Sequence, residues 1–324
     1  MRPSRRAAAT AGSAAALLLP LTGEAAAVGL SMQRAARLAQ ASTSPELSAR
    51  DTAALGAGPA AREAAAGGAT LLLGPLFGRE VAPVLAAAPG ATALTFSNDG
   101  ALAGSGAFLL GVTPSQTVTA TLAYARSRGV RSVAVVSGAD PWSTQAAAAA
   151  RRAQGGVAIT VVGLEAAQRS DPVELLRGAP GGELPDAVLF TDADSASRAV
   201  AARLMAAGEL QMLGTSRWLD GPAVPDLWVA APDPAAFSEF SQGYQARYGT
   251  APGALAGLAF DAVTIARAVQ ASGAPVREAL LTSAGFPGVL GAVRFRADGS
   301  CVRDLAVLAG RSSGYEVVDR IAAA

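Results

Sequence analysis

The sequence predicts an α/β fold built from parallel βα units, and three observations support this prediction. Short apolar runs alternate with stretches of helical spacing through most of the chain, which is typical of a parallel sheet with connecting helices. Glycines close several of the expected helices, at Gly129, Gly155-Gly156 and Gly208. The length of 324 residues corresponds to about two domains of ~150 residues each.

The first 27 residues have two interpretations. An Arg-rich start, an apolar stretch and a small-residue segment at Ala25-Ala26-Ala27 match a secretory signal that would be cleaved. Alternatively, 14–21 is the first buried strand and 28–41 the first helix, joined by a loop at 22–24. We favour the strand, because the helical spacing of the apolar residues over 28–41 requires a partner strand. Residues 1–13 are then a basic, Ala-rich leader, and no Cys lies near the apolar stretch to carry a lipid anchor.

The following elements alternate along the chain. Strands are expected where a short apolar run ends in a Gly, Pro or polar turn, and helices where an Ala-rich stretch has amphipathic spacing. The expected strands are 47–52, 69–73, 92–96, 108–110, 132–136, 157–162, 187–190 and 211–213. The expected helices are 60–66, 79–88, 114–128, 143–154, 172–177 and 195–207.

The pattern changes after residue 220. Four prolines over 221–234 indicate a crossover rather than a strand or helix. Two helices are expected next, at 234–248 and 255–272. The chain then ends in an antiparallel meander of three strands, with a turn at Asp298-Gly299 between the first two. These strands are 291–296, 301–308 and 315–319.

The composition removes several classes of enzyme. The chain has no His, all 26 of its basic residues are Arg, and it has one Cys. It therefore has no Ser-His or Cys-His nucleophile pair, no Lys for a Schiff base or a phosphate loop, and no Cys pair for a disulfide or a zinc site. Carboxylates, hydroxyls, Arg and backbone dipoles remain. Binding is thus favoured over catalysis, and we expect neither catalytic residues nor a cofactor nor a metal ion.

Charge and hydropathy narrow the range of partners. The formal net charge is +1, and charged residues make up 16% of the chain, against about 25% in a typical domain. This balance provides no basic field for nucleic acid, so we expect no nucleic-acid partner. No stretch approaches the ~20 apolar residues that span a bilayer, so we expect no transmembrane segment.

Several short strings occur in an order that is typical of a known family. They are LLLPLTG at 17–23, GPLFG at 74–78, FSND at 96–99, GVTPSQ at 111–116, AFDAV at 259–263 and VRFRADG at 293–299. With them, the chain resembles the type I periplasmic binding proteins, the leucine/isoleucine/valine-binding branch of ABC-transporter receptors. Within that fold it looks closest to the penicillin-binding protein activators.

The resemblance implies two βα lobes with parallel sheets, joined by three crossovers and closing on a ligand in the cleft. Lobe one would comprise 14–112 plus 232–285, and lobe two 113–231 plus 286–324. Ligand contacts are expected at the carboxyl ends of the parallel strands, where helix N-termini offer free N–H groups.

Residues that follow strands of the first lobe are candidate ligand contacts. The resemblance places Thr22, Gly23, Ser97, Asn98 and Asp99 where receptors of this family hold a ligand carboxylate with hydroxyl and backbone N–H groups. Such residues are also ordinary helix caps and turn formers, and that structural role is the alternative for each of them.

Four more residues are candidates for ligand contacts. Phe77 lies where the family usually has a small hydroxyl residue, and it forms either a cleft wall or part of the core. Trp142, in a loop, is placed where receptors often set an aromatic ring against the ligand, and packing against the next helix is the alternative. Asp192 and Asp194 follow a strand, and they either face the cleft or cap the next helix.

The loop after the last parallel strand departs from the family pattern. Amino-acid receptors carry a carboxylate here that pairs with the ligand's α-ammonium, whereas this chain has Thr215, Ser216 and Arg217. A desolvated ammonium without a carboxylate partner is costly, so a standard amino-acid ligand is disfavoured unless Asp192 or Asp99 substitutes. Arg217 would suit an anionic group, or it is a solvated surface residue.

Together, these features predict a non-enzymatic, periplasmic ligand-binding protein. Its partners would be a small-molecule ligand and either an ABC permease or a peptidoglycan synthase. The missing ammonium partner and the LLLPLTG and GPLFG strings favour the synthase activator. The alternative is a carboxylate-based hydrolase of an envelope glycan that would use Asp99, Asp192 and Asp194.

Overall fold

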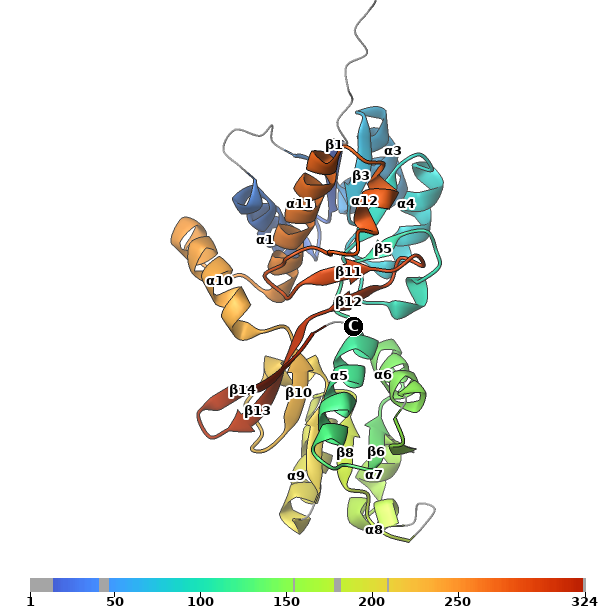
Figure 1. Cartoon of the computed structure of the whole chain (residues 1–324), viewed down its shortest axis with the longest axis vertical. Helices are drawn as coiled ribbons and strands as arrows, with labels where there is room; N and C mark the ends of the chain where they lie inside the picture. The colour runs from blue at the N-terminus through green and yellow to red at the C-terminus, as the bar shows by residue number, and fades with distance from the viewer. Residues whose placement is uncertain (1–13, 41–46, 154, 178–181, 209, 323–324) are drawn as a thin grey trace, which may run out of the picture. The chain divides into compact units, whose positions relative to one another are not determined.

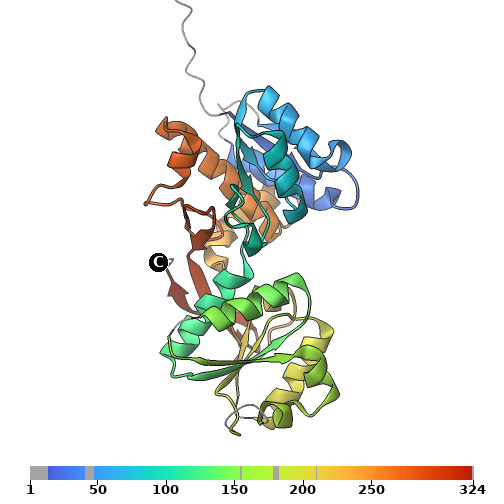
Figure 2. The same cartoon turned by 90° about the vertical axis from the view of Figure 1, so that its right-hand side faces the viewer.

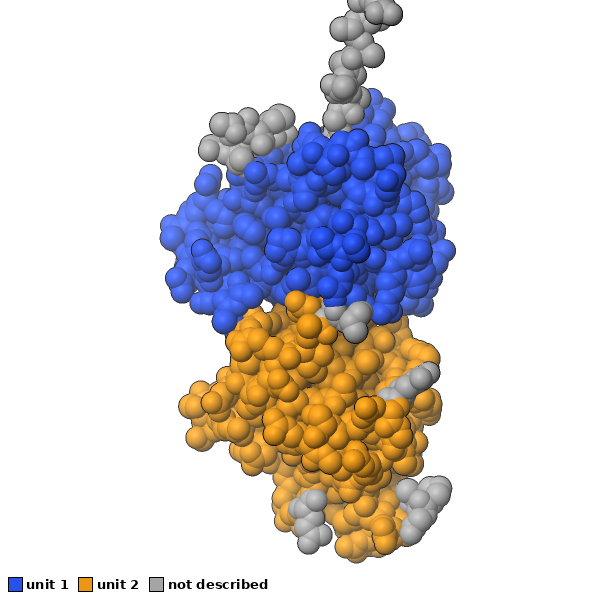
Figure 3. All heavy atoms as spheres, in the orientation of Figure 1, with its two compact units in different colours: residues 1–111, 234–302 blue, residues 112–233, 303–324 orange. Residues whose placement is uncertain are grey.

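The computed structural model of the chain describes residues 14–40, 47–153, 155–177, 182–208 and 210–322 (Figure 1). They form two compact units (Figure 3). Unit 1 contains the residues up to Gly111 and the segment Pro234–Val302, and unit 2 contains Val112–Asp233 and the residues from Arg303 onward. The chain thus passes between the units three times, and the predicted α/β class with two lobes and three crossovers is confirmed.

Unit 1 is built on a five-stranded parallel sheet. Its strands are β1 (Ala14–Leu19), β2 (Ser48–Asp51), β3 (Ala69–Leu73), β4 (Thr92–Thr95) and β5 (Phe108–Leu109). Their order is β2-β1-β3-β4-β5, with every pairing parallel. The apolar stretch near the N-terminus therefore forms a strand inside the sheet, as the favoured interpretation predicts.

Helices cover both faces of the unit 1 sheet, which explains its continuous apolar strands. In β1, Leu17 and Leu19 join one hydrophobic core, whereas Ala16 and Leu18 join another, because successive side chains of a strand point to opposite faces. A parallel strand buried on both faces needs apolar residues at every position. The first core lies beneath α1 (Ala26–Ala39) and α11 (Ala254–Ser272), and the second beneath α3 (Ala57–Ala66) and α4 (Val81–Ala87).

Smaller elements complete unit 1. They are α2 (Thr52–Leu55), the 3-10 helices η1 (Gly78–Glu80) and η2 (Gly100–Leu102), α10 (Pro234–Tyr248) and α12 (Val276–Leu280). Among the described helices, α11 alone is long and apolar enough to cross a membrane. It packs against α1, and Leu258, Val263, Ile265 and Val269 are each at most 4% exposed, so its burial accounts for its apolar composition.

Residues 286–302 lie in unit 1, whereas the sequence analysis places them in the second lobe. The Phe295 ring lies 5.5 Å from that of Phe108, in the edge strand of the unit 1 sheet, measured between centroids. This contact joins residues that are far apart in the sequence, so no local pattern indicates it. The segment forms the two-stranded sheet of β11 (Val293–Phe295) and β12 (Cys301–Arg303).

Unit 2 is built on a seven-stranded mixed sheet. Its strands are β6 (Ser132–Ser137), β7 (Ala158–Gly163), β8 (Ala187–Phe190), β9 (Gln211–Gly214), β10 (Trp228–Ala231), β13 (Leu305–Arg311) and β14 (Gly314–Ile321). The order is β14-β13-β10-β9-β8-β6-β7. The strands from β6 to β10 pair in parallel, and β13 and β14 add in antiparallel fashion.

Two expectations for this sheet are wrong. The proline-rich segment expected to be a crossover contains β10, an interior strand of the sheet, which fits because Pro225 and Pro232 lie outside the strand and remove no hydrogen bond from its ladder. The single strand expected over 301–308 is two strands, β12 and β13, that belong to different sheets.

Helices cover both faces of the unit 2 sheet as well (Figure 2). The helices are α5 (Pro114–Ser127), α6 (Pro141–Arg152), α7 (Leu164–Arg169), α8 (Pro172–Arg177), α9 (Ser195–Ala207) and the 3-10 helix η3 (Ser216–Asp220). α5 begins with a capping box, in which the Thr113 hydroxyl accepts from the Gln116 N–H and the Gln116 side chain accepts from the Thr113 N–H. α6 begins at Pro141, before the predicted start, so Trp142 lies in the first turn of a helix and not in a loop.

Candidate functional site

Three parallel strands of unit 2 end side by side, and their polar successors form a cluster. The register pairs Val136 of β6 with Phe190 of β8, and Phe190 with Gly214 of β9. The loops after these three strands therefore start next to one another at the carboxyl edge of the sheet. This edge is where ligands bind in open parallel sheets.

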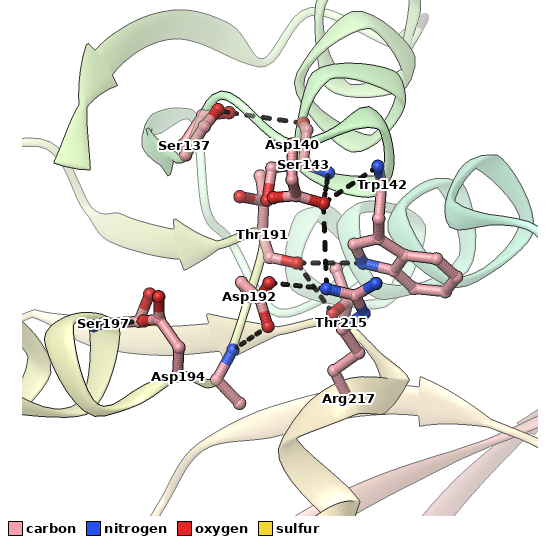
Figure 4. Close-up of polar contacts among 12 residues, drawn as sticks. Ser137, Asp140, Trp142, Ser143, Thr191, Asp192, Asp194, Ser197, Thr215 and Arg217 are labelled. Atoms are coloured by element: carbon pink, nitrogen blue, oxygen red, sulfur yellow. Dashed lines mark hydrogen bonds and ion pairs between the residues drawn. The ribbon is translucent and has the colours of Figure 1, made fainter. Parts of the chain in front are cut away.

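The main-chain oxygen of Thr191 lies at the centre of this edge (Figure 4). It accepts hydrogen bonds from the Trp142 Nε1–H and from the Thr215 hydroxyl, each at 3.0 Å. Thr191 and Thr215 are fully buried and Trp142 is 8% exposed. The loops after β8 and β9 and the start of α6 are thus tied to one buried acceptor.

The guanidinium of Arg217 lies at this edge of the sheet, between two carboxylates. Its Nη1 is 2.5 Å from Asp192 Oδ2 and 3.7 Å from Asp140 Oδ1, and its Cζ lies 4.8 Å from the centroid of the Trp142 ring. The Arg217 side chain is 38% exposed and that of Asp192 20% exposed. We call Asp140, Trp142, Asp192 and Arg217 the Arg217 cluster. Two negative charges surround one positive charge, so the cluster carries a net charge of −1.

Backbone N–H groups hold both carboxylates of the Arg217 cluster. Asp140 caps α6, and its Oδ1 accepts from the N–H groups of Trp142 and Ser143 at 3.0 and 3.2 Å. Burial raises the pKa of the Asp140 carboxyl, but hydrogen bonds from Ser143 and Trp142 and the Arg217 charge outweigh burial and bring the pKa below its ordinary value. Asp192 Oδ1 accepts from the Ala193 N–H at 2.7 Å.

Asp194 lies apart from these contacts. Its Oδ1 accepts from the Ser197 N–H at 2.7 Å and caps α9. The alternative that the sequence gives for Asp194, a helix cap, is the one that the structure shows.

In unit 1, the predicted Thr22-Gly23 loop is fixed by a residue that the sequence analysis does not select. Asp51 Oδ1 accepts from the N–H groups of Leu21 and Ala53, each at 2.9 Å. Burial raises the pKa of Asp51, but hydrogen bonds from the Thr22 hydroxyl and from backbone N–H groups lower it below its ordinary value. The Thr22 hydroxyl is therefore engaged by Asp51, and Thr22 and Gly23 are exposed.

The predicted Ser97-Asn98-Asp99 loop follows β4 and forms a tight turn. Ser97 is 5% exposed, and its hydroxyl accepts from the Asp99 N–H at 3.1 Å. Asp99 caps η2 through the Ala101 N–H at 3.0 Å, whereas Asn98 is exposed. A Cβ at Gly111 would lie 2.3 Å from the main-chain oxygen of Ser97, so only glycine allows the backbone at residue 111 to come this close to that of Ser97.

Phe77 is half-buried and packs against the larger core of unit 1. The Arg79 guanidinium lies 4.4 Å from its ring centroid. Glu80 follows, and burial raises the pKa of its carboxyl, although the Arg79 charge and a hydrogen bond from the Phe77 N–H act in the opposite direction. Oε2 of Glu80 is buried without a hydrogen-bond partner among the described residues.

The structure thus brings Trp142, Asp192 and Arg217 together within unit 2. A role of these residues and of the unit 1 candidates in binding a ligand stays a prediction. The sequence analysis missed Asp140, although an Asp directly before Pro141 is a helix-start signal that could have revealed it. It also missed Thr191, whose role depends on strand order and has no local signal.

Comparison with known proteins identifies the family. A family model described as "Periplasmic binding protein" matches residues 14–314. A candidate branched-chain amino acid ABC transporter from Rhodospirillum rubrum superposes with a TM-score of 0.79 at 23% identity, covering 94% of this chain and 100% of that one. The C-domain of LpoA from Haemophilus influenzae, described as a regulator of PBP1A, gives 0.72 at 16% identity, with 94% and 100% covered. The match to full-length LpoA covers 59% of that protein.

A further structure shares the fold. LivJ from Streptococcus pneumoniae, a branched-chain amino acid transporter substrate binding protein solved in complex with isoleucine, gives a TM-score of 0.63 at 17% identity, with 95% of this chain and 98% of that one covered. No curated protein sequence matches the chain. The family model nevertheless covers most of it, and the chain belongs to the periplasmic binding protein family.

Proposed function

We propose that this protein is a non-enzymatic receptor that binds a small organic ligand outside the cytoplasm, and that the Arg217 cluster is one of its ligand contacts. The observation that supports this proposal is the position of the cluster. A Trp142 ring and a guanidinium that is 38% exposed lie at the carboxyl ends of β6, β8 and β9, the edge at which parallel sheets bind ligands. Membership of the periplasmic binding protein family supports the extracytoplasmic location.

The contacts of the acidic residues favour binding over hydrolysis. Asp99 and Asp194 each accept a backbone N–H at the start of a helix, and Asp192 is paired with Arg217. Glycoside hydrolysis needs a carboxyl whose pKa is raised so that it can act as an acid, whereas the pKa of the nearby Asp140 is lowered.

A ligand screen tests the receptor function. Purified protein would be heated with amino acids, organic acids, sugars and peptidoglycan fragments, and hits would be confirmed by calorimetry. A bound ligand raises the melting temperature by mass action. We expect Asp192→Asn to weaken binding of the hit at least tenfold, whereas Asp186→Asn, which changes a carboxylate that binds Arg131 and Ser132 instead, should leave it unchanged. If no compound shifts the melting temperature, the receptor function is refuted.

The second candidate function is activation of a peptidoglycan synthase. The match to the whole C-domain of LpoA, a regulator of PBP1A, favours this candidate, because that domain shares this fold. Affinity capture of membrane extract on the immobilised protein, followed by mass spectrometry, tests it. We expect recovery of a synthase, and its absence while an ABC permease is recovered would exclude the activator role.

A further inference from the structure

Arg217 fills a place that is already complete without it. The other three residues of the Arg217 cluster form the walls of this place, and each is held by a contact that does not involve the guanidinium. Asp140 is fixed by two N–H groups of α6, Asp192 by the Ala193 N–H, and the Trp142 ring by its bond to the Thr191 oxygen. The two carboxylates and the aromatic face therefore remain in position if the guanidinium leaves.

The walls have the chemistry of a cation site. Carboxylates form charge-assisted hydrogen bonds with guanidinium and ammonium groups, and the indole face attracts the same cations. Without the Arg217 side chain the remaining walls carry a charge of −2. Asp192 is mostly buried, with 20% of its side chain exposed, so its charge is incompletely solvated and favours a cationic occupant.

A second arginine of unit 2 shows what a purely structural stacking contact looks like. The Cζ of Arg198 lies 4.8 Å from the centroid of the Trp218 ring, the same distance as Arg217 from Trp142. Arg198, however, donates to the main-chain oxygens of Ala193, Pro222 and Trp218. It thus ties loops together, whereas the Arg217 guanidinium contacts the carboxylates of Asp140 and Asp192.

We propose that Arg217 is a tethered stand-in for a ligand cation: it occupies a pre-formed guanidinium or ammonium site made by Asp140, Asp192 and Trp142, and so determines which ligands the site admits. A free cation must displace a group that the chain holds nearby at an effective concentration on the order of millimolar. The native site therefore discriminates against simple ammonium ligands. This inference deepens the proposed receptor function, but its test needs no natural ligand.

Removing the tethered guanidinium tests the proposal. The probe is N-ethylguanidinium at up to about 20 mM, far below denaturing concentrations, with NaCl of the same ionic strength as the blank. Binding is followed by Trp fluorescence and calorimetry. We expect Arg217→Ala to bind the probe about tenfold more tightly than the native chain, and the double variant Arg217→Ala with Asp192→Asn to lose this gain.

Arg198→Ala is the matched control, because it removes a stacked guanidinium that no carboxylate contacts in the described part of the chain. It should bind the probe no better than the native protein. If Arg217→Ala does not fold, as judged by circular dichroism, Arg217→Gln, which keeps most of the side chain's length, takes its place. Equal probe affinities for the native chain and the folded Arg217 variant would overturn the proposal. A failed ligand screen with the native protein would not, so the two ideas can fail separately.

Discussion

Replacing Trp142 with Phe should destabilise unit 2 clearly more than the same replacement at Trp218. Both rings are buried, at 8% and 0% exposed, and both carry a guanidinium at 4.8 Å. The loss of ring volume and of cation–π attraction is therefore similar in the two variants. They differ at the indole nitrogen, because Trp142 Nε1 donates to Thr191 at 3.0 Å, whereas Trp218 Nε1 is buried without a partner among the described residues.

The expected size of the difference follows from these two nitrogens. Loss of a neutral buried hydrogen bond costs about 1 kcal/mol, and the Thr191 oxygen keeps its bond from Thr215, so Trp142→Phe leaves no orphaned acceptor. At Trp218 the change removes a buried N–H whose desolvation costs at least about 1 kcal/mol. Trp142→Phe should thus lower the free energy of unfolding by about 2 kcal/mol more than Trp218→Phe.

Urea unfolding at pH 7, followed by far-ultraviolet circular dichroism, measures this difference, and thermal melting checks it. Both positions lie in unit 2, so the same transition reports on both variants. For a unit of this size the difference corresponds to roughly 4–8 °C in Tm. Equal destabilisation by the two variants, or a larger effect at Trp218, would refute the reasoning about the indole nitrogens.

Three further predictions concern glycine packing and pH. A Cβ at Gly288 would lie 2.6 Å from Oδ2 of Asp261, which is 1% exposed, so Gly288→Ala should lower the free energy of unfolding in urea by about 1–3 kcal/mol. Gly243 lies within α10 with open space around its Cβ position, so Gly243→Ala should raise the free energy of unfolding by about 0.5–1 kcal/mol. Equal effects of the two variants would contradict the argument. Because the folded-state pKa of Asp140 is lowered, its contribution to stability is present above the unfolded pKa of about 3.9 and is lost as pH falls through the folded pKa. Asp140→Asn should therefore make the urea midpoint depend less on pH between pH 5 and 2. An unchanged pH dependence would refute this. The raised pKa of Glu80 affects stability in the opposite direction, because the ionised carboxylate lowers stability at neutral pH. Glu80→Gln should therefore raise the urea midpoint at pH 7 but not below pH 4. A shift of the same size at both pH values would contradict this.

Much of the fold could be predicted, because its signals are local. The strand Ala69–Leu73 and the helices Pro172–Arg177, Ser195–Ala207 and Pro234–Tyr248 begin and end at the predicted residues. In α9 the reason is visible, since Asp194 caps the start and Gly208, at φ +66°, ends the helix. Apolar runs ending in glycine or polar turns likewise located the parallel strands.

The missed features depend on partners that are distant in the sequence. β10 has only four residues and lies between Pro225 and Pro232, and it is a strand because β9 and β13 pair with it on either side. The ion pair between Arg217 and Asp192 depends on the order of the strands in the sheet. Trp142 and Asp192 could be selected as candidates from their positions after strands, but the Thr191 oxygen that links Trp142 to Thr215 could not.

The three passages of the chain between the units bear on its synthesis. α1 packs against α11, which is translated only after all the parallel strands of unit 2, and those strands in turn await β13 and β14. Domains generally fold as units, with the N-terminal one first during synthesis, but here unit 1 cannot finish before Pro234–Val302 is made, nor unit 2 before the segment from Arg303 onward. The face of α1 that packs against α11 therefore stays uncovered until α11 has been translated, and we expect the nascent chain to need protection from aggregation during that time. A truncation within Pro234–Val302 would leave both units incomplete, whereas one beyond Arg303 would affect unit 2 alone.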